Sequence, residues 1–152
     1  MNRMKGMLFV RDGAERVQRR VDAIRRLFPD VRYVNNHTGS VFTADYTAMR
    51  RLYSMLRDAG FVFVDSRTTA RSTVRRIARS FGDRYIGRDV FIDNVQQVPA
   101  ILRQLKHAVR IAQKRGYAIA IGHPHKATME ALRQAKEILK GVETVYIDEL
   151  YP

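Results

Sequence analysis

The chain has 152 residues, of which 45% are hydrophobic, and it carries a formal net charge of +13 at pH 7. This length and composition predict a single globular domain over residues 1–152, with residues 1–12 as a soft N-terminal segment. No apolar run reaches the roughly 18 residues of a membrane span, and the apolar run in "MNRMKGMLFVRDG" is shorter than we expect for a secretion signal. The lack of cysteine excludes disulfides and thiolate metal sites. Nothing in the sequence as it stands directs the chain out of the cytoplasm.

The first half of the chain alternates helical and strand patterns. Apolar residues at helical spacing predict a helix over residues 14–28, and "VRYVN" (31–35) then has the composition of a strand. A second helix is capped by Thr43 or Asp45 and stops at Gly60. The apolar run "FVFVD" (61–65) predicts the next strand, and a short helix and the weak strand "RYIG" (84–87) follow.

The second half continues the alternation. Pro99 suits the first turn of a long helix that Gly116 ends. The strand "YAIAI" (117–121), a helix over residues 127–140 and a last strand "TVYI" (144–147) complete the pattern. Because these strands are continuously apolar, both of their faces are covered. The sequence therefore predicts an α/β fold with a mostly parallel sheet of about five strands and flanking helices.

Four polar clusters follow or lie beside the predicted strands. They are "NNHTGS", "DSRTT", "RDVFIDN" and "GHPH". In parallel α/β folds, ligand sites gather at the carboxyl ends of strands. The clusters therefore predict a site on one rim of the fold.

Each cluster has a structural and a functional interpretation. His37 is either a metal ligand or hydrogen-bonding group, or part of an Asn- and Gly-rich turn. Either Asp65 or Ser66 is a local cap beside a solvated Arg67, or Asp65 is an acceptor that orients a neighbouring imidazole or raises its pKa. In "RDVFIDN", an ion pair and a catalytic role are equally compatible with the residues. His123, between Gly122 and Pro124 after a buried strand, is the most specific candidate, whereas a single histidine such as His107 inside a basic helix carries no site signal.

Four stretches follow one another along the chain: "NNHTGSVFTAD", "FVFVDSRTT", "RDVFIDN" and "AIAIGHPHKATMEAL". Together they resemble the divergent polysaccharide deacetylase family over about residues 31–150. The resemblance implies part of a deformed (β/α) barrel. It also implies hydrolysis of a carbohydrate acetyl group by water activated on a divalent metal ion, with zinc expected. His123 would be the catalytic acid, with Asp65 and Arg67 as further catalytic residues and His37 at the metal. The remaining site residues would bind the carbohydrate substrate: Asn35, Asn36, Ser40, Arg88, Asp89 and Asp93.

The chain departs from this family at its N-terminus. Family members begin with an Asp-Asp strand and a histidine motif, and residues 1–30 contain neither. The chain thus resembles the carboxyl-terminal part of the family domain, and we expect it to be incomplete as an isolated enzyme. A missing N-terminal half would leave the sheet edge beside "VRYVN" bare, which predicts either homodimerisation or a partner segment. A longer N-terminus would also allow a location in the cell envelope.

Two other functions compete with deacetylation. A catalytically silent module could bind glycans or cell-wall polyanions through the same rim. The charge of +13 alone favours a nucleic-acid partner. However, the arginine pairs recur at helical spacing as on solvated helix faces, aromatic content is 9%, and no RNA- or DNA-binding motif is present. Nucleic acid is therefore the least favoured partner.

Overall fold

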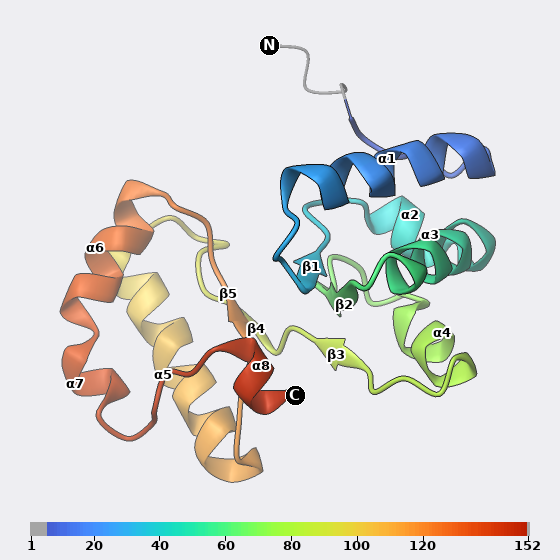
Figure 1. The fold of residues 1–152 in the computed structure, drawn as a ribbon. Helices are drawn as coiled ribbons and strands as arrows, with labels where there is room; N and C mark the ends of the chain where they lie inside the picture. Colours follow the sequence, from blue (N-terminus) through green and yellow to red (C-terminus); the bar gives the residue numbers. More distant parts are fainter. Residues whose placement is uncertain (1–5, 152) are drawn as a thin grey trace. The chain divides into compact units, whose positions relative to one another are not determined.

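The computed structural model describes residues 6–151 and divides the chain into two compact units, with the boundary between Gly87 and Arg88 (Figure 1). Both units combine helices with parallel strands. The mixed α/β class with parallel pairing is confirmed. The five strands, however, form one sheet of three strands and a second sheet of two. That both units belong to one domain, as the chain length predicts, stays a prediction.

The first unit builds its sheet from consecutive strands. Its elements are α1 (Ala14–Leu27), β1 (Tyr33–Asn35), α2 (Ser40–Ala44), α3 (Tyr46–Asp58), β2 (Val62–Asp65), α4 (Val74–Ser80) and β3 (Ile86–Gly87). The strand order is β1-β2-β3, and Tyr33 pairs with Val62. Strand β1 therefore lies at an edge of this sheet, as the sequence predicts. Whether that edge pairs with a second copy stays a prediction.

The core of the first unit lies between its helices and the sheet. Val21 of α1, Met49 of α3 and Ile77 of α4 are fully buried there. Helix α3 begins where predicted, because the side chain of Asp45 accepts a hydrogen bond of 2.8 Å from the backbone N–H of Ala48. Gly60, which follows this helix, has a φ of +77°, a conformation that glycine adopts without strain.

The second unit contains a shorter sheet and a long helix. Its elements are β4 (Val90–Phe91), α5 (Val98–Arg115), β5 (Ala120–Ile121), α6 (Lys126–Gln134), α7 (Lys136–Leu139) and α8 (Ile147–Leu150). Helix α5 has a proline in its first turn and ends at Gly116 with a φ of +90°, both as predicted. Its buried Ile101 and Leu105 pack with Val90 of β4 and Ala131 of α6 in a second core.

Three sequence predictions in the second unit were wrong. "TVYI" is not a strand: Tyr146 is 81% exposed and caps α8, its backbone N–H donating to Glu149. The helix expected over residues 127–140 breaks into α6 and α7 at Ala135, whose N–H bonds three residues back to Leu132. Strand β4 was missed because two residues carry no periodicity, and it is defined by its pairing with β5.

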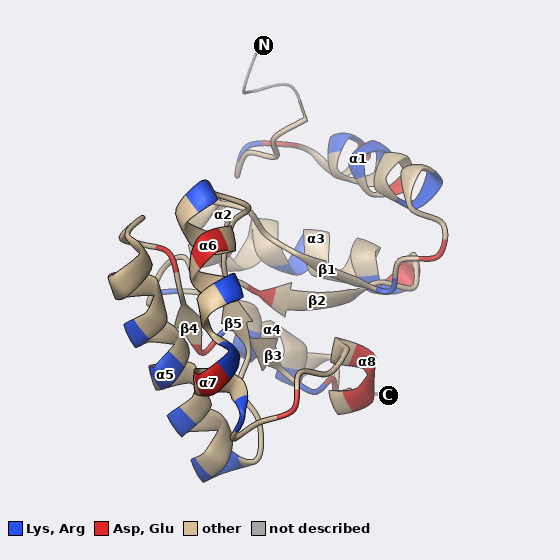
Figure 2. Cartoon of the chain, turned by 90° about the vertical axis from the view of Figure 1, so that its left-hand side faces the viewer, with Lys and Arg blue, Asp and Glu red and all other residues tan. Residues whose placement is uncertain are grey.

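Basic side chains occur on helices of both units, including α1 and α5 (Figure 2). Several cover aromatic rings of their own unit: the Arg25 guanidinium lies 3.6 Å from the centre of the Phe61 ring, and that of Arg76 lies 4.1 Å from the centre of the Tyr46 ring. Part of the positive charge thus serves internal packing. Within residues 6–151, every helix is too short or too polar to cross a bilayer.

Candidate functional site

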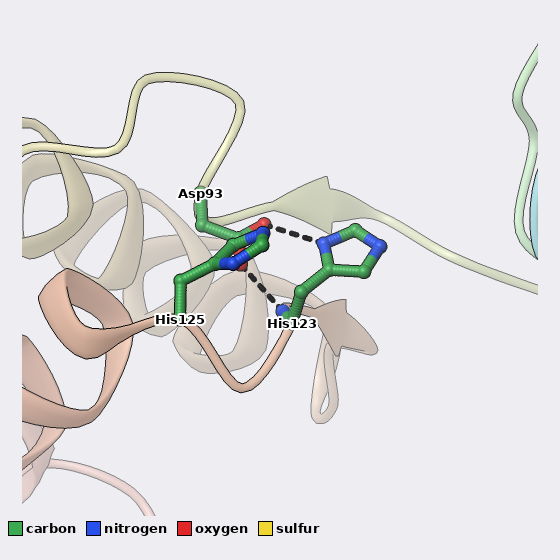
Figure 3. A group of neighbouring side chains, drawn as sticks. All are labelled: Asp93, His123 and His125. Atoms are coloured by element: carbon green, nitrogen blue, oxygen red, sulfur yellow. Dashed lines mark hydrogen bonds and ion pairs between the residues drawn. The ribbon is translucent and has the colours of Figure 1, made fainter. Parts of the chain in front are cut away.

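Asp93 and His123 lie together because they follow neighbouring parallel strands (Figure 3). Phe91 of β4 pairs with Ile121 of β5, so each functional residue comes two positions after a paired residue. The carboxyl ends of both strands meet at one edge of the two-stranded sheet. The strand register therefore places a carboxylate opposite an imidazole.

The turn after β5 depends on a glycine and a proline. A Cβ on Gly122 would lie 2.7 Å from Cγ1 of Ile92, so only glycine fits this close approach without a shift. Pro124 restricts the following backbone. The backbone N–H of His125 donates to the carbonyl of His123 at 2.7 Å, which closes the turn. The turn brings the His123 and His125 rings together, with their centres 5.6 Å apart.

The Asp93 carboxylate is buried and saturated with donors. Its side chain is 1% exposed. Oδ2 accepts hydrogen bonds from the backbone N–H of His123 and, at 3.0 Å, from the Thr128 hydroxyl, while Oδ1 lies 3.1 Å from Nδ1 of His123. Burial acts to raise the pKa of Asp93, but the hydrogen bonds from His123 and Thr128 outweigh it, and the pKa is lowered. Asp93 is therefore the ionised partner of the pair.

The charge of Asp93 fixes the state of the His123 ring. An ionised carboxylate only accepts hydrogen bonds, so Nδ1 carries the hydrogen and Nε2 is the distal nitrogen. The ring also stacks on Phe91, with centres 6.2 Å apart and planes 17° apart. The guanidinium of Arg88 lies 3.8 Å from the centre of the same Phe91 ring. His123 is thus oriented by a carboxylate and an aromatic face.

His125 adds a second imidazole to the pair. One potential ligand atom from each of Asp93, His123 and His125 lies within 4.8 Å of the other two. Within residues 6–151, this is the single group of three or more His, Asp or Glu side chains that meets this spacing. His37 belongs to no such group, so the described residues offer no set of three ligands for a metal ion at His37.

In the first unit, Asn35 and Asn36 join the ends of β1 and β2. The Asn35 side-chain amide donates to the hydroxyl of Ser66 at 3.0 Å. The Asn36 side-chain oxygen accepts from the Ser66 backbone N–H at 3.0 Å, and the Ser66 hydroxyl donates to the Asn36 carbonyl at 2.7 Å. Ser66 is 2% exposed. These amides therefore bind a buried serine of the chain itself; substrate binding by them stays a prediction.

Asp65 makes structural contacts on both of its oxygens. Oδ1 accepts from the Arg67 backbone N–H at 2.8 Å, and Oδ2 accepts from the hydroxyls of Ser72 at 2.8 Å and Tyr85 at 3.0 Å. Burial raises the pKa of Tyr85 to about 12, and the Asp65 carboxylate adds to the rise. The local-cap interpretation of Asp65 is observed. The sequence predicts Asp65 as the carboxylate that orients an imidazole, but the carboxylate that contacts Nδ1 of His123 is that of Asp93.

Arg67 follows Asp65 with a φ of +48°, a left-handed conformation that is uncommon outside glycine. His37 lines a cavity of about 880 Å³ in the first unit, together with Asn35, Asn36 and an apolar set from α1, α2, α3 and β2. Ser40 is the first residue of helix α2 and directly follows residues 35–39, which line the cavity. The first unit therefore holds a largely apolar cavity that polar side chains also line. The catalytic role of Arg67 stays a prediction.

Arg88 and Asp89 lie in the second unit with His123. Asp89 forms an ion pair with Arg115 at 2.7 Å and accepts from the Ile119 backbone N–H at 2.9 Å. The ion-pair alternative therefore holds for Asp89. Arg88 lines a second cavity, of about 350 Å³, which Arg103 and His107 also line. A role for Arg88 in binding anionic sugar groups stays a prediction.

Sequence reasoning missed three residues that shape these sites: Ser66, Phe91 and Thr128. Ser66 was noted only as a local cap, although a serine directly after a buried strand is a candidate for cross-strand bonding. Nothing in the sequence marks Phe91, which stacks on His123. Thr128 lies five residues after His123, in the first turn of α6, and its spacing alone gave no signal.

Two curated proteins are similar to this chain. An uncharacterized protein of Haemophilus influenzae is 37% identical over 128 residues, covering 84% of this chain and 46% of the relative. The uncharacterized protein YibQ of Escherichia coli is 37% identical over 101 residues, covering 66% of this chain and 32% of the relative. The chain thus spans less than half the length of these curated relatives.

A solved structure shares the fold. The crystal structure of an uncharacterized protein from Agrobacterium tumefaciens C58 superposes with a TM-score of 0.85 over 99% of this chain and 62% of the other, at 24% identity. A family model, described as divergent polysaccharide deacetylase, matches residues 2–151, a longer stretch than the motifs indicated. The chain therefore belongs to the divergent polysaccharide deacetylase family.

Proposed function

We propose that this chain contributes the acid side of a carbohydrate deacetylase, with His123 as the general acid and Asp93 as its partner. The observation that carries the proposal is the 3.1 Å contact between Asp93 Oδ1 and His123 Nδ1 at the ends of two neighbouring strands. An ionised, buried carboxylate stabilises an imidazolium and fixes its orientation. Family membership supports an acetylated carbohydrate as the class of substrate.

In this reaction, a general base of the complete site takes a proton from water, and the water oxygen adds to the acetyl carbonyl and forms a tetrahedral intermediate. His123 Nε2 then gives its proton to the departing sugar nitrogen or oxygen, the bond from that atom to the carbonyl carbon breaks, and acetate leaves. Asp93 holds Nδ1–H throughout and compensates the positive charge of the doubly protonated ring. The metal ion implied by the family has no three-ligand set at His37, so we assign no step to it.

A silent glycan-binding module is the second candidate. It is favoured by the contacts of Asp65, because the carboxylate that the sequence offered as a catalytic group already accepts three hydrogen bonds within the chain. Such a module would use the rim of the 880 Å³ cavity, where His37 and the Asn35 and Asn36 amides lie. It would bind a glycan without releasing acetate.

Acetate release from an N-acetylated oligosaccharide, measured on a protein that contains the complete family domain, tests the two candidates. We expect His123→Ala to lower turnover about 100- to 10,000-fold, the range for acid–base groups, in a protein that circular dichroism shows to be folded. His107→Ala is the matched control, since His107 is an exposed histidine of α5 in the same unit. Turnover that survives His123→Ala would refute the acid role.

A binding measurement separates the remaining outcomes. If the protein releases no acetate but the oligosaccharide shifts the NMR signals of Asn35, Asn36 and His37, the chain is a binding module and the hydrolase proposal is wrong. If neither acetate release nor such shifts occur, both proposals fail. Acetate release that depends on His123 and not on His107 supports the hydrolase.

A further inference from the structure

We propose that Asp93, His123 and His125 bind a divalent transition-metal ion, which takes the place of the hydrogen bond between Asp93 and His123. Asp93 lies in the segment that follows β4, and His123 and His125 lie in the segment that follows β5, both in the second unit (Figure 3). This site differs from the one that the family resemblance implies at His37. Metal binding at this site does not depend on the proposed function. Its effect on His123 as a general acid does rest on the proposed function.

The spacing of Asp93 and His123 already suits a metal ion. In a tetrahedral zinc site with ligands about 2.0–2.1 Å from the metal, two ligand atoms lie about 3.3 Å apart. Oδ1 of Asp93 and Nδ1 of His123 are 3.1 Å apart. An ion between them therefore requires loss of the intervening hydrogen and almost no movement of either side chain.

His125 supplies the third ligand with a small rotation. One ring nitrogen of His125 lies within 4.8 Å of one potential ligand atom on each of Asp93 and His123, so it must approach them by up to about 1.5 Å to complete a tetrahedral face. The side chain is exposed and makes no cap bond to helix α6, whose first turn it precedes. Its ring is therefore able to turn toward Asp93 without breaking a helix contact.

The carboxylate is held by a second set of contacts that metal binding leaves intact. Oδ2 of Asp93 accepts from the His123 backbone N–H and from the Thr128 hydroxyl, whereas Oδ1 faces the His123 ring. Donors of this kind orient a ligating carboxylate and strengthen metal binding. Asp93 therefore presents one oxygen in a fixed direction.

The donor set selects the class of ion. Two imidazole nitrogens and one carboxylate oxygen suit zinc and cobalt(II) better than calcium or magnesium, which prefer oxygen ligands. A water molecule would complete a tetrahedron. Because the ion occupies both atoms that join Asp93 to His123, the metal-loaded chain no longer holds the acid pair. Excess zinc should then inhibit whatever activity depends on that pair.

Titration with zinc chloride alone, followed by calorimetry, tests the site on the whole chain. We expect one ion per chain, and we expect His125→Ala to weaken binding at least about tenfold, since loss of even an outer-shell partner costs that much. Cobalt(II) should show the intense visible absorption of a tetrahedral site, which His125→Ala should remove. His107→Ala is the matched control and should leave both signals unchanged.

Three results would overturn the inference: no zinc binding up to about 1 mM, binding that survives His125→Ala, or binding that is lost on His37→Ala instead. Circular dichroism of each variant confirms that it is folded. No substrate is present in these measurements, so they stand whatever the deacetylase assay gives. Zinc binding without acetate release would leave the metal site intact and refute only the proposed function.

Discussion

Gly122 lets β5 end against the side chain of Ile92, because a Cβ at this position would lie 2.7 Å and 2.8 Å from two Ile92 carbons. His123 is the next residue, and its backbone N–H donates to Asp93. We predict that Gly122→Ala costs about 1–3 kcal/mol of unfolding free energy, as overpacking does, and disturbs the acid pair. Chemical denaturation gives the cost, and the His123 NMR signals report the disturbance.

Gly13→Ala is the matched control for this change. An added Cβ at Gly13 meets no atom within 4 Å, and its φ of −70° is open to any residue. We expect a smaller loss of stability there and unchanged His123 signals. Equal losses for the two variants, or unchanged His123 signals in Gly122→Ala, would show that the close approach to Ile92 does not position the histidine.

The Thr128 hydroxyl is expected to contribute more than an ordinary buried hydroxyl. It is 3% exposed and donates to the charged Asp93 at 3.0 Å. Hydrogen bonds to charged groups contribute about 1.5–3 kcal/mol to the unfolding free energy, against about 0.5–1.5 kcal/mol for bonds between neutral groups. The loss of unfolding free energy in Thr128→Val should therefore lie in the upper of these two ranges. Thr43→Val is the control, because its buried hydroxyl donates to the neutral carbonyl of Gly39 at 3.2 Å. Equal costs in urea denaturation would contradict this prediction.

The fold class and the functional turn were predictable from the sequence, and the side-chain partners were not. Apolar strands alternating with helices indicated parallel pairing, and "GHPH" after the apolar run "YAIAI" marked His123. The partner of His123 was assigned to Asp65, since both follow apolar strands. Strand register decided otherwise: β4 is only two residues long, and its pairing with β5 places Asp93 beside the histidine. Sequence periodicity does not reveal a pairing that short.

The last strand shows the same limit. "TVYI" has the composition of a strand, yet Tyr146 is exposed and begins a helix, because burial rather than β propensity determines strands. His37 stood out as a rare histidine in a polar cluster. Among the described residues, the group of three that could hold a metal ion is Asp93, His123 and His125, and a metal ion at His37 stays a prediction. In the sequence His125 lies two residues after His123, but nothing there marks Asp93 as their neighbour.

Tyr85 should make stability depend on alkaline pH. Its pKa is raised from 10.0 to about 12, chiefly by burial and then by Asp65. Because the pKa of Tyr85 is raised in the folded state, the contribution of its protonated hydroxyl to folding stability is fully present below about pH 10 and is lost as the pH rises through 12. Wild type should therefore lose more unfolding free energy than Tyr85→Phe over this range. Parallel pH profiles of the two proteins in chemical denaturation would contradict the assignment.

The bond between the Asn35 amide and the Ser66 hydroxyl distinguishes a structural role of Asn35 from substrate binding. The two groups lie 3.0 Å apart, and Ser66 is 2% exposed. We predict that Asn35→Ala and Ser66→Ala each cost about 1–3 kcal/mol, and that the double variant costs less than the two together by at least about 0.5 kcal/mol, as for contacting pairs. Urea denaturation of the four proteins measures this coupling. Additive costs together with weakened oligosaccharide binding by Asn35→Ala would instead assign Asn35 to the substrate, because an amide free to bind a sugar need not stabilise the junction of β1 and β2.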